Sequence, residues 1–231
     1  MTSSYKVKIC GTTNVDDAQM TADAGADFFG VVVEVDFSPR SLTIDAAKSL
    51  FSTPVLPPVA LVYNMASARV ETLIQQLNPF AVQFLSLAEP SFVIYLKKAY
   101  PTVEVWQSIH LPQAGESVDL ENFQKTVQKS VTAGVDALLF DTAALSKGKM
   151  KFGGTGVTSD WDIVKELMDS IPGTVPIWLA GGINPDNVGE AIDKINPYGI
   201  DLCSGVEATR GKKDAAKLSS LMTTIRARHS K

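Results

Sequence analysis

The sequence is poor in the residues that bind metals or form disulfides. Its 231 residues include two cysteines, Cys10 and Cys203, and two histidines, His110 and His229. Neither cysteine has a metal-ligand spacing, and a zinc or iron site would lack ligands. Two cysteines in a chain of this length do not make a disulfide scaffold, and they suit a reducing compartment. The composition therefore predicts no metal site.

Long apolar runs and clusters of basic residues are also missing. No stretch approaches the ~18 consecutive apolar residues of a membrane span, and the first eleven residues have no apolar segment long enough for a signal peptide. The net charge is −4, and lysine and arginine are not gathered into one run. We therefore expect a cytoplasmic protein that binds neither membranes nor nucleic acid.

Short apolar runs alternate regularly with segments of helical periodicity. The runs are apolar throughout, as expected of parallel strands that are covered on both faces. Eight strand–helix pairs in this length predict an α/β fold, a single (β/α)8 TIM barrel over residues 1–231. An open doubly wound sheet is the alternative, but no GxGxxG follows the first strand. The predicted strands are residues 7–10, 27–35, 58–63, 80–85, 103–109, 135–140, 175–180 and 199–203.

Local signals predict some of the element boundaries. Asn14 is a candidate cap for the first helix, and Gly25 is a candidate stop. Pro185, directly behind Asn184, predicts the start of the seventh helix. The longest irregular stretch is predicted at about residues 141–159, and loops of this length in compact domains are usually functional.

In barrels of this kind the active site lies at the carboxyl ends of the strands. Cys10 and Asp141 end the first and sixth predicted strands, and Arg40 follows the second. Taken alone, Cys10 also fits a small buried hydrophobe, Asp141 a turn or cap, and Arg40 a solvated surface. These residues therefore remain candidates for an acid–base pair and a ligand contact.

Glycine-bearing loops follow the seventh and eighth predicted strands. They contain Gly181 and Gly182, and Ser204 and Gly205; a third glycine run covers 153–156. Glycines let backbone N–H groups approach a phosphate closely. Loops at these two positions commonly bind phosphate in this fold, so the sequence predicts a phosphorylated ligand.

The same residues carry a resemblance to a known family. The motifs at 8–11, 38–40, 140–142, 152–156, 179–188 and 204–207 resemble those of phosphoribosylanthranilate isomerases of tryptophan biosynthesis, in the same order along the chain. The resemblance implies an Amadori rearrangement of a small phosphoribosyl substrate, with no cofactor and no metal, by a monomer or a homodimer. It implies that Asp141 is the general acid, Cys10 the thiolate base and Arg40 the contact for the anthranilate carboxylate. The implied substrate-binding residues are Arg40, Gln83, Gly154, Gly181, Gly182, Asp201, Ser204 and Gly205.

The middle of the chain departs from the family pattern. Leu85 and Ser86 stand where histidine and glycine are common, residues 34–37 are more acidic, and Cys203 replaces a common serine. These changes leave open a related enzyme for another N-phosphoribosyl amine, or a barrel that binds a phosphosugar without turnover. A histidine-pathway isomerase would have an aspartate at Cys10. An indole-glycerol phosphate synthase would use catalytic lysines near strand ends; Lys8 lies close to one, but partner positions for it are not obvious.

Overall fold

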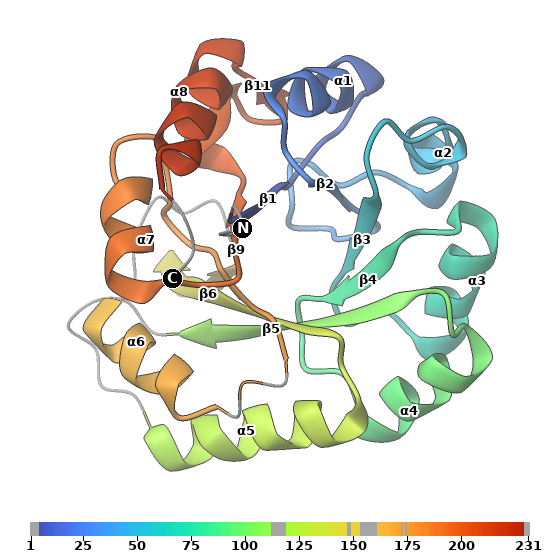
Figure 1. Ribbon diagram of the computed structural model, residues 1–231. Helices are drawn as coiled ribbons and strands as arrows, with labels where there is room; N and C mark the ends of the chain where they lie inside the picture. Colours follow the sequence, from blue (N-terminus) through green and yellow to red (C-terminus); the bar gives the residue numbers. More distant parts are fainter. Residues whose placement is uncertain are drawn as a thin grey trace.

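The strands of the computed structural model form a barrel that the helices surround (Figure 1). The structure describes residues 5–111, 119–146, 149–152, 161–171, 173 and 175–228, with the backbone alone for 142–146 and 149–152. The barrel wall consists of β1 (Lys6–Ile9), β2 (Phe28–Val32), β3 (Pro58–Val62), β4 (Ala81–Phe84), β5 (Glu104–Leu111), β6 (Ala137–Ser146), β8 (Ile177–Leu179) and β9 (Gly199–Leu202).

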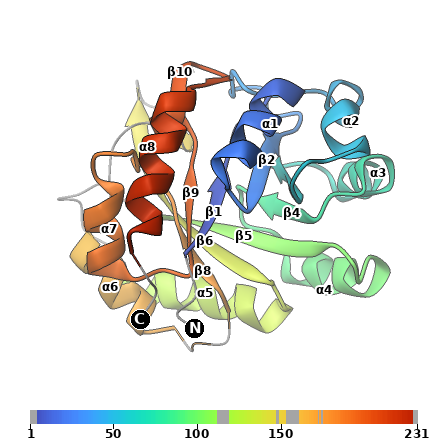
Figure 2. The ribbon, with the colours of Figure 1, turned by 45° about the horizontal axis from the view of Figure 1, so that its top comes forward.

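A ring of helices lies outside these strands. The last helix closes the ring, because it packs against both the seventh and the first (Figure 2). The helices are α1 (Val15–Ala24), α2 (Ile44–Ser52), α3 (Ser67–Leu77), α4 (Pro90–Ala99), α5 (Leu120–Ala133), α6 (Trp161–Asp169), α7 (Val188–Ile195) and α8 (Ala215–Arg226). The shorter elements are β7 (Lys149–Phe152), the 3-10 turn η1 (Ser204–Val206), β10 (Glu207–Thr209) and β11 (Lys212–Lys213).

Parallel pairing around the whole wall closes the barrel. Hydrogen-bonded neighbours follow the order β5, β4, β3, β2, β1, β9, β8, β6, and β6 pairs again with β5. In β1, Ile9 lies opposite Phe29 on one side and Leu202 on the other. Since β5 and β6 join the two ends of the sheet, the wall has no free edge. The predicted (β/α)8 barrel is confirmed.

Aromatic rings fill the amino-terminal end of the barrel interior. The ring of Phe28 lies 5.3 Å from that of Phe80 and 5.6 Å from those of both Trp106 and Trp178. The two tryptophan rings are 5.2 Å apart. Because these rings occupy this end, the space for a ligand lies at the opposite end of the strands.

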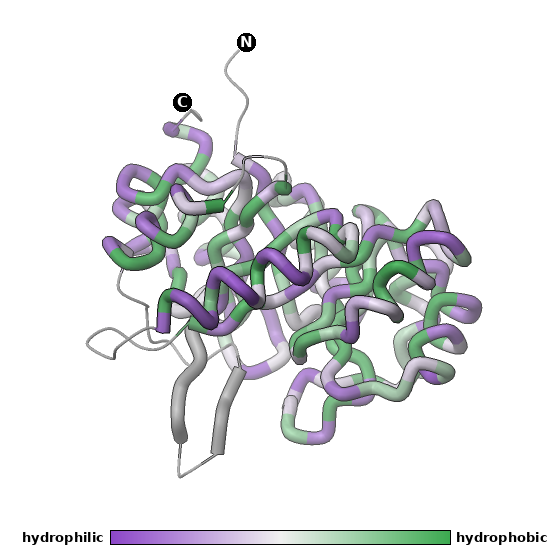
Figure 3. The backbone as a smooth tube through the Cα atoms, turned by 90° about the horizontal axis from the view of Figure 1, so that it is seen from below, coloured by the Kyte–Doolittle hydropathy of each residue, from purple (hydrophilic) through white to green (hydrophobic). Residues whose placement is uncertain are grey.

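A second apolar layer joins the strands to the helices. Alternate residues of β1, Val7 and Ile9, are fully buried in it, together with Leu73 of α3 and Leu218 of α8. Figure 3 shows hydrophilic and hydrophobic residues alternating along the surrounding helices, as expected of helices with one buried face. The strands are thus covered on both sides, which explains why their sequences are apolar throughout.

Both predicted boundaries of α1 are confirmed. The backbone N–H of Asp17 donates to Asn14 Oδ1 at 2.8 Å, and Gly25 ends the helix with φ 89°. Among the described residues, no helix has the length and apolar character of a membrane span.

Two predicted boundaries were wrong. The α7 helix begins at Val188 and not at Pro185, because Asn184 first closes an irregular turn. In that turn Asn184 Oδ1 accepts from the backbone N–H groups of Asp186 and Asn187, at 2.8 and 3.2 Å. The stretch after Asp141 is not irregular throughout, since β6 continues to Ser146 and pairs antiparallel with β7. The sequence predicted that this strand ends where the continuous apolar run stops, but backbone pairing with β7 extends it.

We predict that Gly199→Ala lowers the free energy of unfolding by about 1–3 kcal/mol, the usual cost of overpacking a core. A Cβ at this position would lie 2.5 Å from the indole ring of Trp178, which is buried and has no room to move. Urea unfolding measures the change. Gly173→Ala is the matched control, because its Cβ would meet nothing within 4 Å. Equal stability of the two variants would contradict the prediction.

Candidate active site

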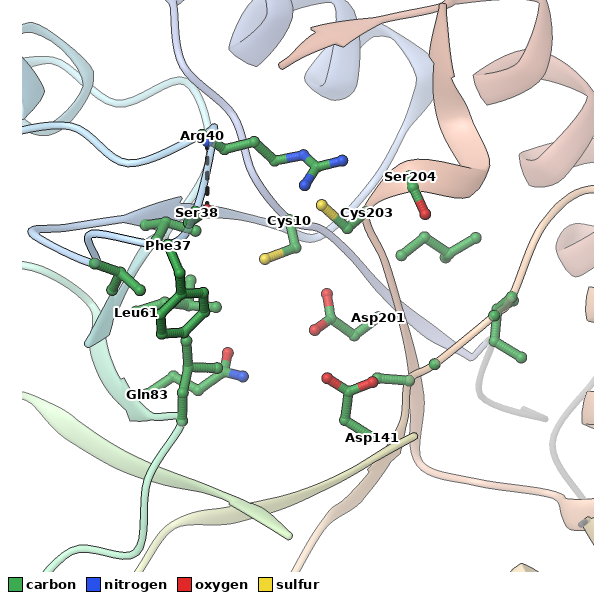
Figure 4. A pocket seen from close by; sticks show the side chains of 18 residues that line it. Cys10, Phe37, Ser38, Arg40, Leu61, Gln83, Asp141, Asp201, Cys203 and Ser204 are labelled. Atoms are coloured by element: carbon green, nitrogen blue, oxygen red, sulfur yellow. Dashed lines mark hydrogen bonds between the residues drawn. The ribbon is translucent and has the colours of Figure 1, made fainter. Parts of the chain in front are cut away.

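A pocket opens at the carboxyl ends of the barrel strands, where the sequence predicted the active site. It encloses about 710 Å³ of empty space, including its mouth. Figure 4 shows Cys10 and Cys203 at one end, with Asp141 and Gln83 farther along. Eight of the predicted site residues line it: Cys10, Arg40, Gln83, Asp141, Gly181, Gly182, Asp201 and Ser204.

Cys10 is the first residue after β1 and faces the pocket. Its backbone N–H donates to the carbonyl of Leu202 at 2.7 Å, which fixes it against the end of β9. The neighbouring strand has Gly30 beside it, where a Cβ would lie 3.2 Å from Cys10 Sγ. The absence of a side chain at Gly30 therefore makes room for the thiol.

Asp141 lies near the point where β6 passes the rim of the barrel. It is opposite His110 of β5 in the strand register, and its side chain is buried. His110 Nε2 lies 2.6 Å from the carbonyl oxygen of Leu85, and burial lowers the pKa of its imidazole. The carboxyl of Asp141 thus reaches the pocket from the wall formed by β5 and β6.

The two predicted phosphate loops are in direct contact. Gly181 and Gly182 have φ angles of 88° and 67°, in the left-handed region that favours glycine. A Cβ on Gly205 would lie 2.1 Å from the carbonyl oxygen of Ile183, so only glycine fits there. Ser204 begins the η1 turn beside it. The two loops therefore form one backbone surface at the pocket, and Gly205 lies directly behind the residues that line it. Gly154, the remaining predicted site residue, is outside the described residues.

Arg40 lines the pocket, and one edge of its guanidinium is paired within the protein. Its Nε and Nη2 donate to the two carboxylate oxygens of Glu207, at 2.7 and 2.5 Å. Both side chains are buried, and the hydrogen bonds to Glu207 raise the pKa of Arg40. Glu207 thus occupies the Nε and Nη2 edge of Arg40, and Nη1 makes no hydrogen bond with Glu207. The sequence could not show this, because Arg40 and Glu207 are far apart in the chain.

Glu207 and Lys213 connect this arginine to the base candidate. Lys213 Nζ lies 3.3 Å from Glu207 Oε1 and donates to the carbonyl oxygen of Cys10 at 2.5 Å. Burial alone would raise the pKa of Glu207, but the hydrogen bond from Arg40 and the charge of Lys213 outweigh it, and the pKa lies below its ordinary value. The carboxylate is therefore ionised and holds two cations behind the pocket.

Comparison with known proteins identifies this arrangement. Residues 7–224 match the family described as N-(5'phosphoribosyl)anthranilate (PRA) isomerase. The chain belongs to this family. The resemblance predicted from the motifs is confirmed, and with it the interpretation of the chain as an isomerase.

Individual members of the isomerase family match over nearly the whole chain. The N-(5'-phosphoribosyl)anthranilate isomerase of Methanocella arvoryzae is 37% identical over 96% of this chain and 98% of its own length. The solved phosphoribosyl anthranilate isomerase of Thermococcus kodakaraensis is 27% identical, with a TM-score of 0.78 over 98% of this chain and all of that one. A third, solved in complex with reduced 1-(o-carboxyphenylamino)-1-deoxyribulose 5-phosphate, is 23% identical, with a TM-score of 0.73 over 97% of this chain and 100% of its own.

A buried ion pair at the pocket floor was only half predicted. Lys8 Nζ lies 2.7 Å from Asp201 Oδ1, and the lysine side chain is completely buried. Asp201 was a predicted site residue, but Lys8 had no place in this isomerase reaction. The strand period of two contained the signal, since Lys8 and Cys10 must point to the same face of β1.

The second cysteine is a site residue that sequence reasoning noted only as a departure from the family. A hydrogen bond with Cys203, together with burial, raises the pKa of the Cys10 thiol. The hydrogen bond from Cys10 lowers the pKa of Cys203 to about 7 despite its burial, with help from the charges of Lys213 and Arg40. The two thiols therefore hold their protons with different strengths.

The remaining wall of the pocket is largely apolar. The side chain of Phe37 packs edge-on against Tyr63, with ring centroids 5.0 Å apart. Gln83 Nε2 donates to Ser108 Oγ at 3.0 Å, while its Oε1 accepts no hydrogen bond from the described residues. The lining residues here that sequence reasoning had not assigned are Val32, Val35, Phe37, Ser38, Leu61 and Leu85.

We predict that Glu207→Ala lowers the free energy of unfolding by about 3–5 kcal/mol, because it leaves two buried cations without their carboxylate. Urea unfolding at neutral pH measures it. The control is Glu121→Ala, whose exposed pair with Lys125 on α5 is worth at most about 1 kcal/mol. Similar losses in the two variants would contradict the prediction.

The difference in free energy of unfolding between the wild type and Glu207→Ala depends on pH with a fixed sign. The folded-state pKa of Glu207 lies below its ordinary value of 4.5. The pair therefore contributes its full stability above that pH and loses it as the pH falls through the folded-state pKa. We expect the gap between the wild type and Glu207→Ala to narrow below about pH 4.5.

Proposed function

We propose that this chain catalyses the Amadori rearrangement of N-(5'-phosphoribosyl)anthranilate to 1-(2-carboxyphenylamino)-1-deoxyribulose 5-phosphate, a step of tryptophan biosynthesis. The observation that carries the proposal is one pocket that holds the Cys10 thiol, the Asp141 carboxyl and two glycine loops in contact. Binding alone would need only the loops. A thiol and a carboxyl facing one cavity supply the base and the acid of a proton-transfer reaction.

The acid step is assigned to Asp141. Its carboxyl donates a proton to the ring oxygen of the ribose while the bond from that oxygen to C1 breaks. The nitrogen lone pair then forms a double bond to C1, and a protonated Schiff base results. The position of Asp141 at the rim of β6, where it lines the pocket, suits this role, because a general acid must lie within hydrogen-bond reach of the atom that it protonates.

The base step is assigned to Cys10. As a thiolate it removes the proton from C2 of the sugar, and the electrons of that C–H bond form the C1–C2 double bond while the Schiff-base nitrogen becomes neutral. The resulting enolamine takes this proton back at C1 from Cys10 while its C2 hydroxyl gives up its own proton to the Asp141 carboxylate, so the ketone forms and both groups return to their starting states. A thiolate is the reactive form of cysteine, so the surroundings of Cys10 must favour it.

The glycine loops are assigned to the phosphate. The proposed donors are the backbone N–H groups of Gly182 and Ser204, which line the pocket, and of Gly205 beside Ser204, because phosphate oxygens are acceptors for such groups. Holding the phosphate fixes one end of the substrate. The sugar carbons are then kept near the acid and the base, which is where positioning lowers the barrier.

The apolar wall is assigned to the aromatic ring. Val35, Phe37, Leu61 and Leu85 line the pocket. Figure 4 shows Phe37 and Leu61 on the side opposite Asp201 and Asp141. Leucine in place of the family's common histidine makes this wall more apolar, which suits a benzoate ring. Arg40 still has Nη1 for the carboxylate of the ring, since Glu207 occupies Nε and Nη2.

We expect the wild type to convert N-(5'-phosphoribosyl)anthranilate and both Cys10→Ser and Asp141→Asn to lose ~100-fold or more in kcat, the usual size of an acid or base contribution. Loss of the substrate's fluorescence measures turnover. Asp162→Asn, an exposed carboxylate of α6 outside the pocket, is the control that keeps full activity. A folded wild type without turnover would overturn the proposal.

We predict that Gly205→Ala raises KM by about 10-fold or more and weakens inhibition by inorganic phosphate to a similar degree, because hydrogen bonds to a charged group are worth about 1.5–3 kcal/mol. The added Cβ would lie 2.1 Å from the carbonyl oxygen of Ile183 and must push the loops apart. Gly173→Ala is again the control. An unchanged phosphate inhibition constant would show that these loops do not bind the phosphate.

A further inference from the structure

We propose that Cys203 is a positioning residue for the base: it shares a single proton with Cys10, and it accepts the Cys10 proton when the substrate is in place. The inference rests on the proposed function, in which the Cys10 thiolate removes the C2 proton. It adds a residue that is outside the family pattern on which the assignment of Cys10 and Asp141 depends.

The strand register places the two thiols side by side. Ile9 and Leu202 are the last paired residues of β1 and β9, and Cys10 and Cys203 come next on each strand. The backbone N–H of Cys10 continues the ladder to Leu202. A Cβ on Gly11 would lie 2.8 Å from Cys203 Sγ, so this sulfur is turned back toward β1. Both thiols line the pocket and lie next to each other in Figure 4.

The charges around the two thiols favour one thiolate and disfavour two. Lys8 and Asp201 form an ion pair on the strands beneath them, and Arg40, Lys213 and Glu207 form the cluster behind them. Three cations and two carboxylates leave one positive charge. One thiolate balances it, whereas a second would add an unpaired negative charge in a buried place. Asp141 reaches the same pocket from β6 and adds no charge to this count, because in the proposed reaction it is the protonated, neutral acid.

The sharing has a chemical consequence for the reaction. In the resting pair the Cys10 thiol keeps its proton and donates a hydrogen bond to the Cys203 thiolate. This agrees with the raised pKa of Cys10 and the lowered pKa of Cys203. Moving that proton onto Cys203 places the thiolate on Cys10. Cys10 then takes the proton from C2, so both thiols carry protons while the enolamine exists. Protonation of the enolamine at C1 returns the pair to one proton.

The pH dependence of kcat/KM tests the proposal in wild type, Cys203→Ser and Cys203→Ala, in a reducing buffer. The wild type should lose activity below about pH 7, the pKa of Cys203. A lone thiol has a pKa of about 8.5, so the loss should begin at a higher pH in Cys203→Ala. The pH at which Cys203→Ser loses activity should lie between those of the wild type and Cys203→Ala, because its hydroxyl still donates a hydrogen bond to the Cys10 thiolate.

These pKa values set the expected size of the effect. At pH 6.5, kcat/KM of Cys203→Ala should be about 20-fold below wild type, and at pH 9.5 within about threefold of it. The thiolate absorbance at 240 nm gives a second readout without substrate. Since the chain has only these two cysteines, the wild type should titrate in two well-separated steps and each variant in one.

The outcomes separate this proposal from the proposed function. Identical pH profiles with a uniform loss of activity would mean that Cys203 only packs against Cys10, and would overturn the inference. Two overlapping thiol titrations near pH 8.5 in the wild type would overturn it as well. Two separated titrations in a folded wild type without turnover would overturn the isomerase assignment and the base role, while the shared proton itself would stand. Urea midpoints of both variants control for folding.

Discussion

The bidentate pair of Arg40 and Glu207 holds the carboxyl end of the barrel together. Arg40 comes from the loop after β2 and Glu207 from the segment after β9, while Lys213 links Glu207 to the backbone carbonyl of Cys10 after β1. The three loops that surround the base therefore meet at one carboxylate. Two cations that share a buried carboxylate leave few alternative arrangements, so this pair also fixes where the thiols lie.

The barrel separates the parts that supply stability from those that supply chemistry. At the amino-terminal end Phe28, Trp106 and Trp178 fill the interior with rings, and a Cβ at Gly199 would lie 2.5 Å from the indole of Trp178. At the other end the interior changes to an ion pair, two thiols and a carboxyl. Charged groups are tolerated in that half because each has a partner of opposite charge or faces the open pocket, whereas an unpaired charge among the rings would have neither.

Much of the fold follows from the sequence, because its signals are local. Continuous apolar runs mark parallel strands, and Asn14 and Gly25 bound α1 through contacts within a few residues. The wrong boundaries arose where hydrogen bonds that the apolar pattern does not reveal decide where an element begins or ends. The β6 strand continues because β7 pairs with it, and α7 starts late because Asn184 closes a turn with its own side chain.

At the site, sequence patterns predicted which residues lie at one rim but not which distant residues pair with them. Strand ends and glycine loops put Cys10, Asp141 and Gly182 near one another, because strand order alone brings them to one rim. The partner of Arg40 could not be inferred, since 167 residues separate it from Glu207. Lys8 could have been assigned to the pocket from its spacing to Cys10. Its pairing with Asp201, however, depends on the register of β1 against β9, which no local pattern contains.

The scarcity of histidine gives the thiol pair its importance. An enzyme that removes a proton from carbon at neutral pH needs a base with a pKa near that pH, and histidine is the usual choice. Here the described histidine, His110, contacts the carbonyl of Leu85, and its imidazole pKa is lowered by burial. A single thiol titrates too high to be largely ionised at pH 7. In the proposed pair, two thiols share one proton within a cluster that carries one excess positive charge. The hydrogen bond from Cys10 lowers the pKa of Cys203 to about 7, so the pair loses its first proton in the working range.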